Sequence, residues 1–134
     1  MSEEKRLIEY HLKRAKDTLK TVELSLLYQS IDGNSVGNRL YYACFYAVLA
    51  LLESKEIRVK SHKTIKSQFG LHFILTGIID AKYGKIYSNL FDLRQDSDYT
   101  NLIFIDISEA ALFVQGTKDL IEVIEKILDE NKKY

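Results

Sequence analysis

The sequence of 134 residues contains no proline, no tryptophan and a single cysteine, and its charges cancel. With Cys44 alone, the chain can form no internal disulfide, and its three histidines lack the spacing of a helical zinc pair. Because nineteen basic residues balance nineteen acidic ones, any attraction to nucleic acid must come from a local patch. The uncharged run at residues 40–52 is too short to span a bilayer, and the N-terminus resembles no signal peptide, so we expect a cytoplasmic protein without a membrane segment.

That uncharged run is the most informative stretch of the chain, and it follows directly after Asn38 and Arg39. It is apolar or aromatic on all sides, which is typical of a helix packed on most of its circumference. We predict a central helix that Ser35 caps and that ends near residue 55. Asn38, Tyr42 and Tyr46 are spaced by four and therefore lie in one row along it, and buried tyrosine hydroxyls require polar partners.

The remaining apolar positions predict further helices around the central one. In residues 4–28 they step by four and three, as they do again after residue 106, where Asp106 begins a capping-box pattern. Ser61 is the predicted N-cap of a third helix that Gly77 ends, and Asp80 opens a fourth. The sequence thus predicts a single domain over residues 1–134, an all-α up-and-down bundle of about five helices.

Residues 99–105 have no helical spacing and are rich in β-branched and aromatic side chains. One strand would have no partner in an all-α protein, so we predict an ordered loop that lies across the bundle or against a partner. Four adjacent apolar side chains at 102–105 would form an aggregation-prone patch in water, which favours a homodimer.

Several polar residues at the predicted helix ends are candidates for function. Arg94 lies on or beside the buried row of the fourth helix, where a guanidinium is costly unless it is paired, and Asp98 follows four residues later. Internal ion pairs to Asp98 or Glu53 are the alternative explanation for Arg39 and Arg94. For His62, which directly follows a predicted N-cap, the alternative is a solvated helix start.

The chain contains a local cluster of basic residues although its net charge is zero. Only Glu56 opposes this cluster, which consists of Lys55, Arg58, Lys60, Lys63 and Lys66. It is either a solvated face or part of a phosphate-binding surface. A simple antiparallel bundle would place Lys60, His62 and Lys63 beside Arg94 and Tyr99, with Arg39 roughly 25 Å away at the other end of the central helix.

Four stretches together resemble a known family. They are Asn-Arg-Leu-Tyr-Tyr-Ala-Cys-Phe-Tyr-Ala at 38–47, Lys-Ser-His-Lys at 60–63, Phe69 and Phe73 followed by Gly77, and Leu-Arg-Gln-Asp-Ser-Asp-Tyr at 93–99. This combination is similar to the HEPN domains, in particular to their small stand-alone bacterial and archaeal branch. The resemblance implies a four- or five-helix bundle that often forms a homodimer, with a polar cleft at the helix ends.

Many HEPN proteins are metal-independent endoribonucleases or toxins, and others are partners of small nucleotidyltransferases. The ribonuclease signature is an arginine with a polar residue near it and a histidine a few residues later. Arg94 fits the arginine, but Tyr99 stands where the histidine would be, and a phenol with its ordinary pKa of about 10 is a poor base at neutral pH. Tyr99 can instead donate a hydrogen bond, stack on a base or be modified by a transferase, as in some related pairs.

The resulting hypothesis is a HEPN-type module that is paired with a small nucleotidyltransferase in a toxin-antitoxin-like system and binds RNA or a nucleotide. The alternatives are a metal-independent ribonuclease in which His62 or Tyr99 replaces the missing histidine, and a purely structural dimerisation module. No metal or cofactor is expected. The candidate catalytic residues are Arg94, Tyr99 and His62, and the candidate ligand-binding residues are Asn38, Arg39, Tyr42, Lys60, Lys63 and Asp98.

Overall fold

The structure, a computed structural model, describes residues 2–99 and 105–131, and for residues 95–99 the backbone alone. All of its described elements are helices, which confirms the predicted all-α class. Most of the predicted loop at 99–105 lies outside the described residues. The elements are α1 (Glu3–Leu27), α2 (Gly33–Ser54), α3 (His62–Phe69), the π-helical turn η1 (Gly70–Ile74), α4 (Ala81–Tyr99), α5 (Ile107–Ala111) and α6 (Phe113–Asn131).

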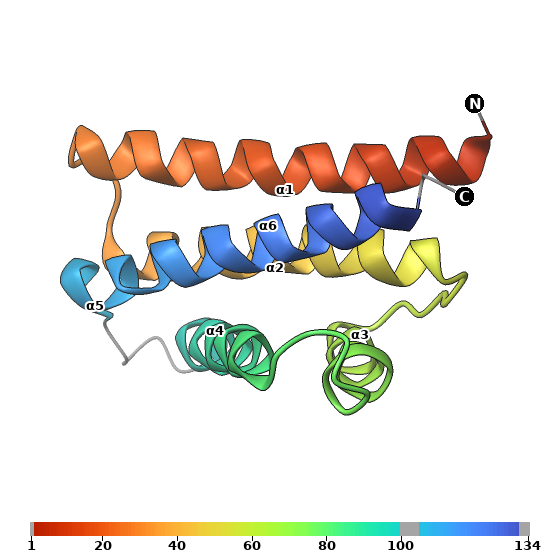
Figure 1. Ribbon diagram of the computed structural model, residues 1–134. Coiled ribbons are helices and arrows are strands. Elements are labelled where there is room, and N and C mark those ends of the chain that lie inside the picture. Colours follow the sequence, from red (N-terminus) through yellow and green to blue (C-terminus); the bar gives the residue numbers. More distant parts are fainter. Residues whose placement is uncertain (1, 100–104, 132–134) are drawn as a thin grey trace.

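Helix α2 is the centre of the molecule. In Figure 1, α1, α2 and α6 run along one another, whereas α3 and α4 are seen end-on because they cross the direction of the other three. Helix α2 contacts α1, α3, α4, α5 and α6, and the core includes the fully buried Tyr41, Leu51 and Cys44. The prediction of a central helix packed on most of its circumference is confirmed.

The start of α2 differs from the sequence prediction. Asp32, not Ser35, is the N-cap, and its carboxylate accepts a hydrogen bond from the backbone N–H of Ser35 at 2.8 Å. The helix therefore begins earlier, with Gly33 in its first turn. A side chain at Gly33 would overlap the carbonyl oxygen of Ile105, and the Asn34 carboxamide accepts the Ile105 N–H at 2.7 Å. The tight approach of Ile105 thus requires glycine at position 33.

Other helix ends follow the sequence more closely. The hydroxyl of Ser61 accepts the Thr64 N–H at 3.0 Å and caps α3, as predicted. Gly77 adopts a φ of +78°, which suits glycine and ends this region. Asp106 caps the next helix as predicted, but this helix ends at Ala111 and α6 begins separately at Phe113. Tyr99, expected in the loop, is the last residue of α4.

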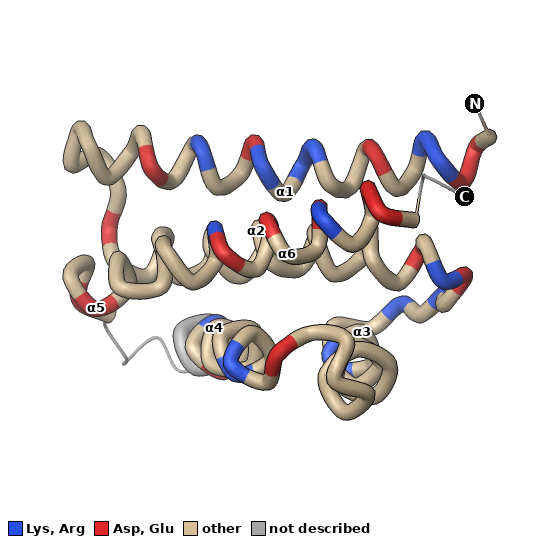
Figure 2. Tube along the Cα trace, in the orientation of Figure 1, with Lys and Arg blue, Asp and Glu red and all other residues tan. Residues whose placement is uncertain are grey.

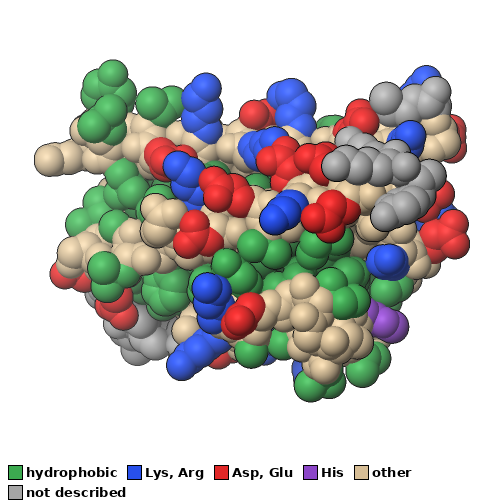
Figure 3. All heavy atoms as spheres, in the orientation of Figure 1, with side chains coloured by type: hydrophobic (Ala, Val, Ile, Leu, Met, Phe, Trp, Pro, Cys, Tyr) green, Lys and Arg blue, Asp and Glu red, His purple; other side chains and the backbone are tan. Residues whose placement is uncertain are grey.

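The charges lie mainly on the outer helices. Figure 2 shows both signs along α1 and α6, whereas most of α2 carries none. On the face seen in Figure 3, basic and acidic side chains are interspersed, and Lys16 of α1 forms an ion pair with Glu125 of α6. This ion pair joins the first and last long helices, which contact one another. Among the described helices, none has the length and apolarity needed to cross a membrane.

Candidate functional site

An aromatic cluster forms where α3 and α4 cross α2, and it comprises Tyr41, Tyr42, Phe45, His62, Tyr87 and Phe91. The fully buried ring of Tyr41 stacks on Tyr87 with 5.8 Å between ring centroids. His62 stacks on Phe45 at 4.4 Å, and its Nδ1 lies 2.7 Å from the Tyr41 hydroxyl oxygen. This hydrogen bond supplies the polar partner that a buried tyrosine in α2 requires.

Arg94 of α4 lies against the same cluster. Its guanidinium carbon is 5.2 Å from the ring centroid of Tyr41 and 5.3 Å from that of Tyr42, distances typical of cation–π contacts. The half-buried Arg94 is thereby held at the edge of the core beside His62. The side chains of Asp98 and Tyr99 lie outside the described residues, so the predicted Arg94–Asp98 pair stays a prediction.

The titratable side chains of the aromatic cluster are held in their neutral forms beside the positive charge of Arg94. Burial raises the pKa of Tyr41 to about 12 and also raises the pKa of Tyr87. Burial, assisted by the charge of Arg94, lowers the pKa of His62 from its ordinary value. At neutral pH the cluster therefore contains two buried phenols, an uncharged imidazole and one guanidinium. Of these, the partly exposed imidazole and guanidinium are the groups suited to moving a proton and to binding a phosphate.

The prediction that His62 lies near Arg94 is confirmed, but the expected distance from the start of the central helix is wrong. His62 contacts Tyr41, which precedes the end of α2 by about 20 Å at 1.5 Å per residue. The chain after α2 turns back toward α3, which crosses α2 instead of running antiparallel to it (Figure 1). The assumption that successive helices run antiparallel could not reveal that the chain turns back along α2.

Asn38 and Arg39 line a separate pocket of about 370 Å³, which we call the arginine pocket. Its residues are Arg14 and Thr18 from α1 and Asn38, Arg39, Tyr42 and Tyr46 from α2. The predicted row of Asn38, Tyr42 and Tyr46 is confirmed by this shared lining. Tyr42 belongs to both the pocket and the aromatic cluster and therefore connects them.

Nothing in the sequence indicated that α1 would contribute to this site. Arg14 lies on the polar side of an amphipathic helix, as most surface arginines do. In the structure its guanidinium carbon lies 4.3 Å from the ring centroid of Tyr46. The only usable signal would have been the antiparallel register of α1 and α2, which the sequence does not specify.

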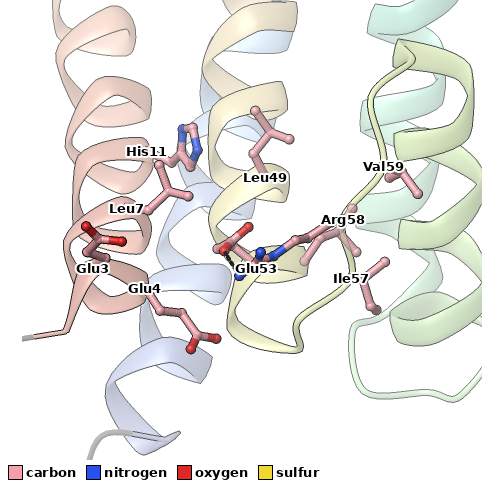
Figure 4. A pocket seen from close by; sticks show the side chains of 10 residues that line it. Glu3, Glu4, Leu7, His11, Leu49, Glu53, Ile57, Arg58 and Val59 are labelled. Carbon is pink, nitrogen blue, oxygen red and sulfur yellow. Dashed lines mark ion pairs between the residues drawn. The ribbon is translucent and has the colours of Figure 1, made fainter.

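A second pocket, lined by α1, α2 and the connection that follows α2, has the opposite character. This carboxylate pocket has a volume of about 440 Å³, and Figure 4 shows Glu3, Glu4 and His11 of α1 facing Glu53 and Arg58 across it. Arg58 is paired with Glu53 at 3.5 Å. Burial lowers the pKa of His11, and its Nδ1 makes no hydrogen bond within the described part of the chain. The site does not suit an anion.

Lys60 and Lys63 are exposed on either side of the α3 cap. Neither forms an ion pair among the described side chains, and their part in a phosphate-binding surface stays a prediction. Lys66 is placed differently, with its ammonium 4.7 Å from the Phe91 ring centroid. The basic segment is therefore not uniform, since one of its lysines packs against the aromatic cluster.

Comparison with known proteins supplies the family. The model of the HEPN domain matches residues 8–133. A protein of Thermotoga maritima named "UPF0332 protein" is 30% identical over 133 residues, which cover 99% of each chain. A "putative toxin" of Methanocaldococcus jannaschii is 34% identical over 130 residues, 97% of this chain and 82% of the relative. A second "putative toxin" of that organism is 34% identical over 92 residues, 69% of this chain and 68% of the relative. The chain belongs to the HEPN domain family.

Proposed function

We propose that this chain is a toxin-like HEPN module that binds single-stranded RNA at the aromatic cluster and acts together with a small nucleotidyltransferase. The observation that carries the RNA proposal is the position of Arg94 over the rings of Tyr41 and Tyr42, directly beside His62. A guanidinium at the edge of an aromatic surface combines a phosphate ligand with a stacking face for a base. Tyr42 is half-buried, so part of its surface is accessible.

The direct test is a titration of a fluorescent single-stranded RNA oligomer with wild-type protein and with Arg94→Ala. Loss of one arginine–phosphate contact should weaken binding about 10- to 100-fold, since hydrogen bonds to charged groups contribute roughly 1.5–3 kcal/mol. Arg58→Ala is the matched control, because Arg58 is 73% exposed and lies in the carboxylate pocket. Thermal unfolding of each variant separates lost binding from lost folding. Equal affinity of Arg94→Ala and wild type would remove the proposal.

A second candidate function, metal-independent RNA cleavage, is favoured by the bond between His62 and Tyr41. When Nδ1–H donates to the Tyr41 oxygen, the lone pair of Nε2 remains to accept the proton of a ribose 2′-hydroxyl. The 2′-oxygen then attacks the adjacent phosphorus, and the bond to the 5′-oxygen breaks as that oxygen takes a proton from water. The hydroxide that remains receives the proton held on Nε2, which restores water and the neutral imidazole. Arg94 would stabilise the charge of the phosphate. In this arrangement His62, rather than Tyr99, replaces the missing histidine.

Cleavage is tested with labelled RNA in the presence of EDTA, which excludes a dependence on divalent metal. Wild type should produce 2′,3′-cyclic phosphate ends, and His62→Gln should not. Tyr41→Phe should keep RNA binding but reduce cleavage, because the imidazole loses the bond that orients it. If the wild-type protein binds RNA tightly but leaves it intact, the proposal of RNA cleavage is wrong and the proposal of RNA binding stands.

The nucleotidyltransferase partner and the homodimer are proposals that the family resemblance supports, and the "putative toxin" names of two relatives support the toxin-like role. A toxin-like protein needs an agent that restrains it, and a transferase that modifies a tyrosine near the site would do so. Purification of the tagged chain from its native cells, followed by mass spectrometry, should recover a small nucleotidyltransferase. Sedimentation should show a dimer at micromolar concentration, whereas a monomer at high micromolar concentration would contradict the homodimer.

A further inference from the structure

We propose that the arginine pocket holds a second phosphate of the same RNA strand, with Arg14 of α1 and Arg39 of α2 as its ligands. This proposal rests on the proposed RNA binding at Arg94 and names an additional subsite for it. The two subsites would be joined by Tyr42 and Tyr46. The bound species is then a strand of at least two nucleotides, not an isolated nucleotide at one site.

The charge of the pocket supports an anionic ligand. Arg14 and Arg39 are both exposed, and none of the described residues that line the pocket is acidic. Neither arginine forms an ion pair with a carboxylate among the side chains that the structure describes. In the carboxylate pocket, by contrast, Arg58 is already paired with Glu53. Two arginines without a carboxylate partner can neutralise a phosphate without first breaking an internal ion pair.

The orientation of Arg14 is fixed by stacking. Its guanidinium carbon lies 4.3 Å from the ring centroid of Tyr46 and 5.9 Å from that of Tyr10. Stacking on a ring occupies the face of a guanidinium and leaves the N–H groups at its edge for a phosphate. The neighbouring Thr18 hydroxyl donates to the Arg14 carbonyl at 2.7 Å, so toward a ligand it acts as an acceptor, for example for a sugar hydroxyl.

The two subsites are continuous along one face of α2. The ring centroids of Tyr42 and Tyr46 lie 5.9 Å apart, with Arg14 against Tyr46 and Arg94 against Tyr42. A pair of tyrosines therefore separates two guanidinium groups. Proteins that hold single strands use the same alternation, in which basic groups contact phosphates and aromatic rings stack on bases.

The experiment measures affinity for single-stranded RNA as a function of salt in Arg14→Ala and in Arg6→Ala, a matched loss of an exposed arginine from the same helix outside the pocket. For single strands, each phosphate contact contributes about 0.7 to the slope of log affinity against log salt. Arg14→Ala should lower the slope by about that amount and weaken binding about tenfold, whereas Arg6→Ala should leave both near wild type. Arg14→Lys, which keeps the charge but loses the planar fork, should restore the slope and only part of the affinity.

The outcomes distinguish this inference from the proposed function. If Arg94→Ala abolishes binding while Arg14→Ala equals Arg6→Ala, the second subsite is wrong and RNA binding at Arg94 stands. If wild type binds no RNA, the proposed function is wrong. A titration with uridine 5′-monophosphate followed by NMR then tests whether the arginine pocket binds a phosphate. Shifts of the Arg14 side-chain and Tyr46 signals that Arg14→Ala removes would retain a phosphate site there, and their absence would overturn it.

Discussion

The arginine pocket and the carboxylate pocket both lie between α1 and α2, the second of them completed by the connection after α2, and they have opposite chemistry. Glu3, Glu4 and Glu53 face one of them, and Arg14 and Arg39 face the other. The difference lies less in the number of charges than in what surrounds each arginine. Arg58 contacts a carboxylate, whereas Arg14 contacts a tyrosine ring and keeps its positive charge uncompensated. A chain with no net charge can thus contain a local anion site, because packing separates the two signs along one helix pair.

Reversing one charge of the arginine pocket should have the largest effect on RNA affinity. Arg39→Glu introduces a carboxylate there, like those that line the carboxylate pocket. A carboxylate at this position repels a phosphate in addition to losing the contact, so RNA affinity should fall more than about 100-fold. Lys20→Glu, the same reversal at an exposed position of α1, is the control and should cost only a few-fold. Fluorescence anisotropy checks both, and equal losses would indicate a general charge effect rather than a site.

A smaller effect is expected from Tyr46, which supports Arg14 and extends the stacking surface. Tyr46→Ala should weaken RNA binding by about 5- to 10-fold, because the ring is half-buried and the lower end of the roughly 1–3 kcal/mol range for stacking of a base on a ring applies. Tyr46→Phe keeps the ring and should stay within about twofold of wild type. If the phenylalanine variant binds as poorly as the alanine variant, the hydroxyl matters and the stacking argument is wrong.

The two half-buried histidines should make the protein less stable in mild acid. Burial lowers the pKa of His11 and of His62 below the ordinary value of 6.5, so the unfolded chain binds more protons than the folded one. Stability should therefore be fully present above pH 6.5 and decline as the pH falls from there toward the lowered pKa values. Urea unfolding at a series of pH values measures this, and the double variant His11→Gln, His62→Gln should flatten that part of the curve. NMR titrations that place both pKa values at or above 6.5 would contradict the account.

The smallest effect is expected in the carboxylate pocket. Arg58 is 73% exposed and its Glu53 partner 12% exposed, so Arg58→Ala should lower the free energy of unfolding by less than about 1 kcal/mol. Because Arg58 is not part of the proposed RNA surface, its loss should leave RNA affinity unchanged. A marked loss of RNA binding in this variant would mean that the basic segment near α3, and not the arginine pocket, contacts the strand.

The sequence predicted the helices well and their crossing angles poorly. Apolar periodicity specifies which face of a helix is buried, and Ser61 and Asp106 mark helix starts through local hydrogen bonds. Nothing local states that α3 crosses α2, and so the contact between His62 and Tyr41 was not foreseen. The start of α2 was misplaced because Ser35 is as suitable a cap residue as Asp32, and nothing local shows that the absent side chain of Gly33 makes room for Ile105.

The sequence identified several residues of the candidate site, but only the fold shows which of them lie together. Asn38, Arg39, His62 and Arg94 could be named because polar residues next to an apolar run stand out and because the motifs resemble a family. Arg14 could not be named, since an arginine on an amphipathic helix is ordinary until its neighbours are known. The registers and crossings of helices distant in sequence decide such neighbours, and periodicity carries no information about them.

The most direct measurement of the central claim is photocrosslinking of a bound RNA that contains 4-thiouridine, with the crosslinked peptides identified by mass spectrometry. The account predicts crosslinks in the tryptic peptide of residues 40–55, which carries Tyr42 and Tyr46, and their loss in Arg94→Ala. Fragmentation of that peptide separates Tyr42 and Tyr46 from Leu49 and Glu53, which line the carboxylate pocket. Crosslinks confined to residues of the carboxylate pocket, or a pattern that Arg94→Ala leaves unchanged, would contradict the assignment of RNA binding to the aromatic cluster.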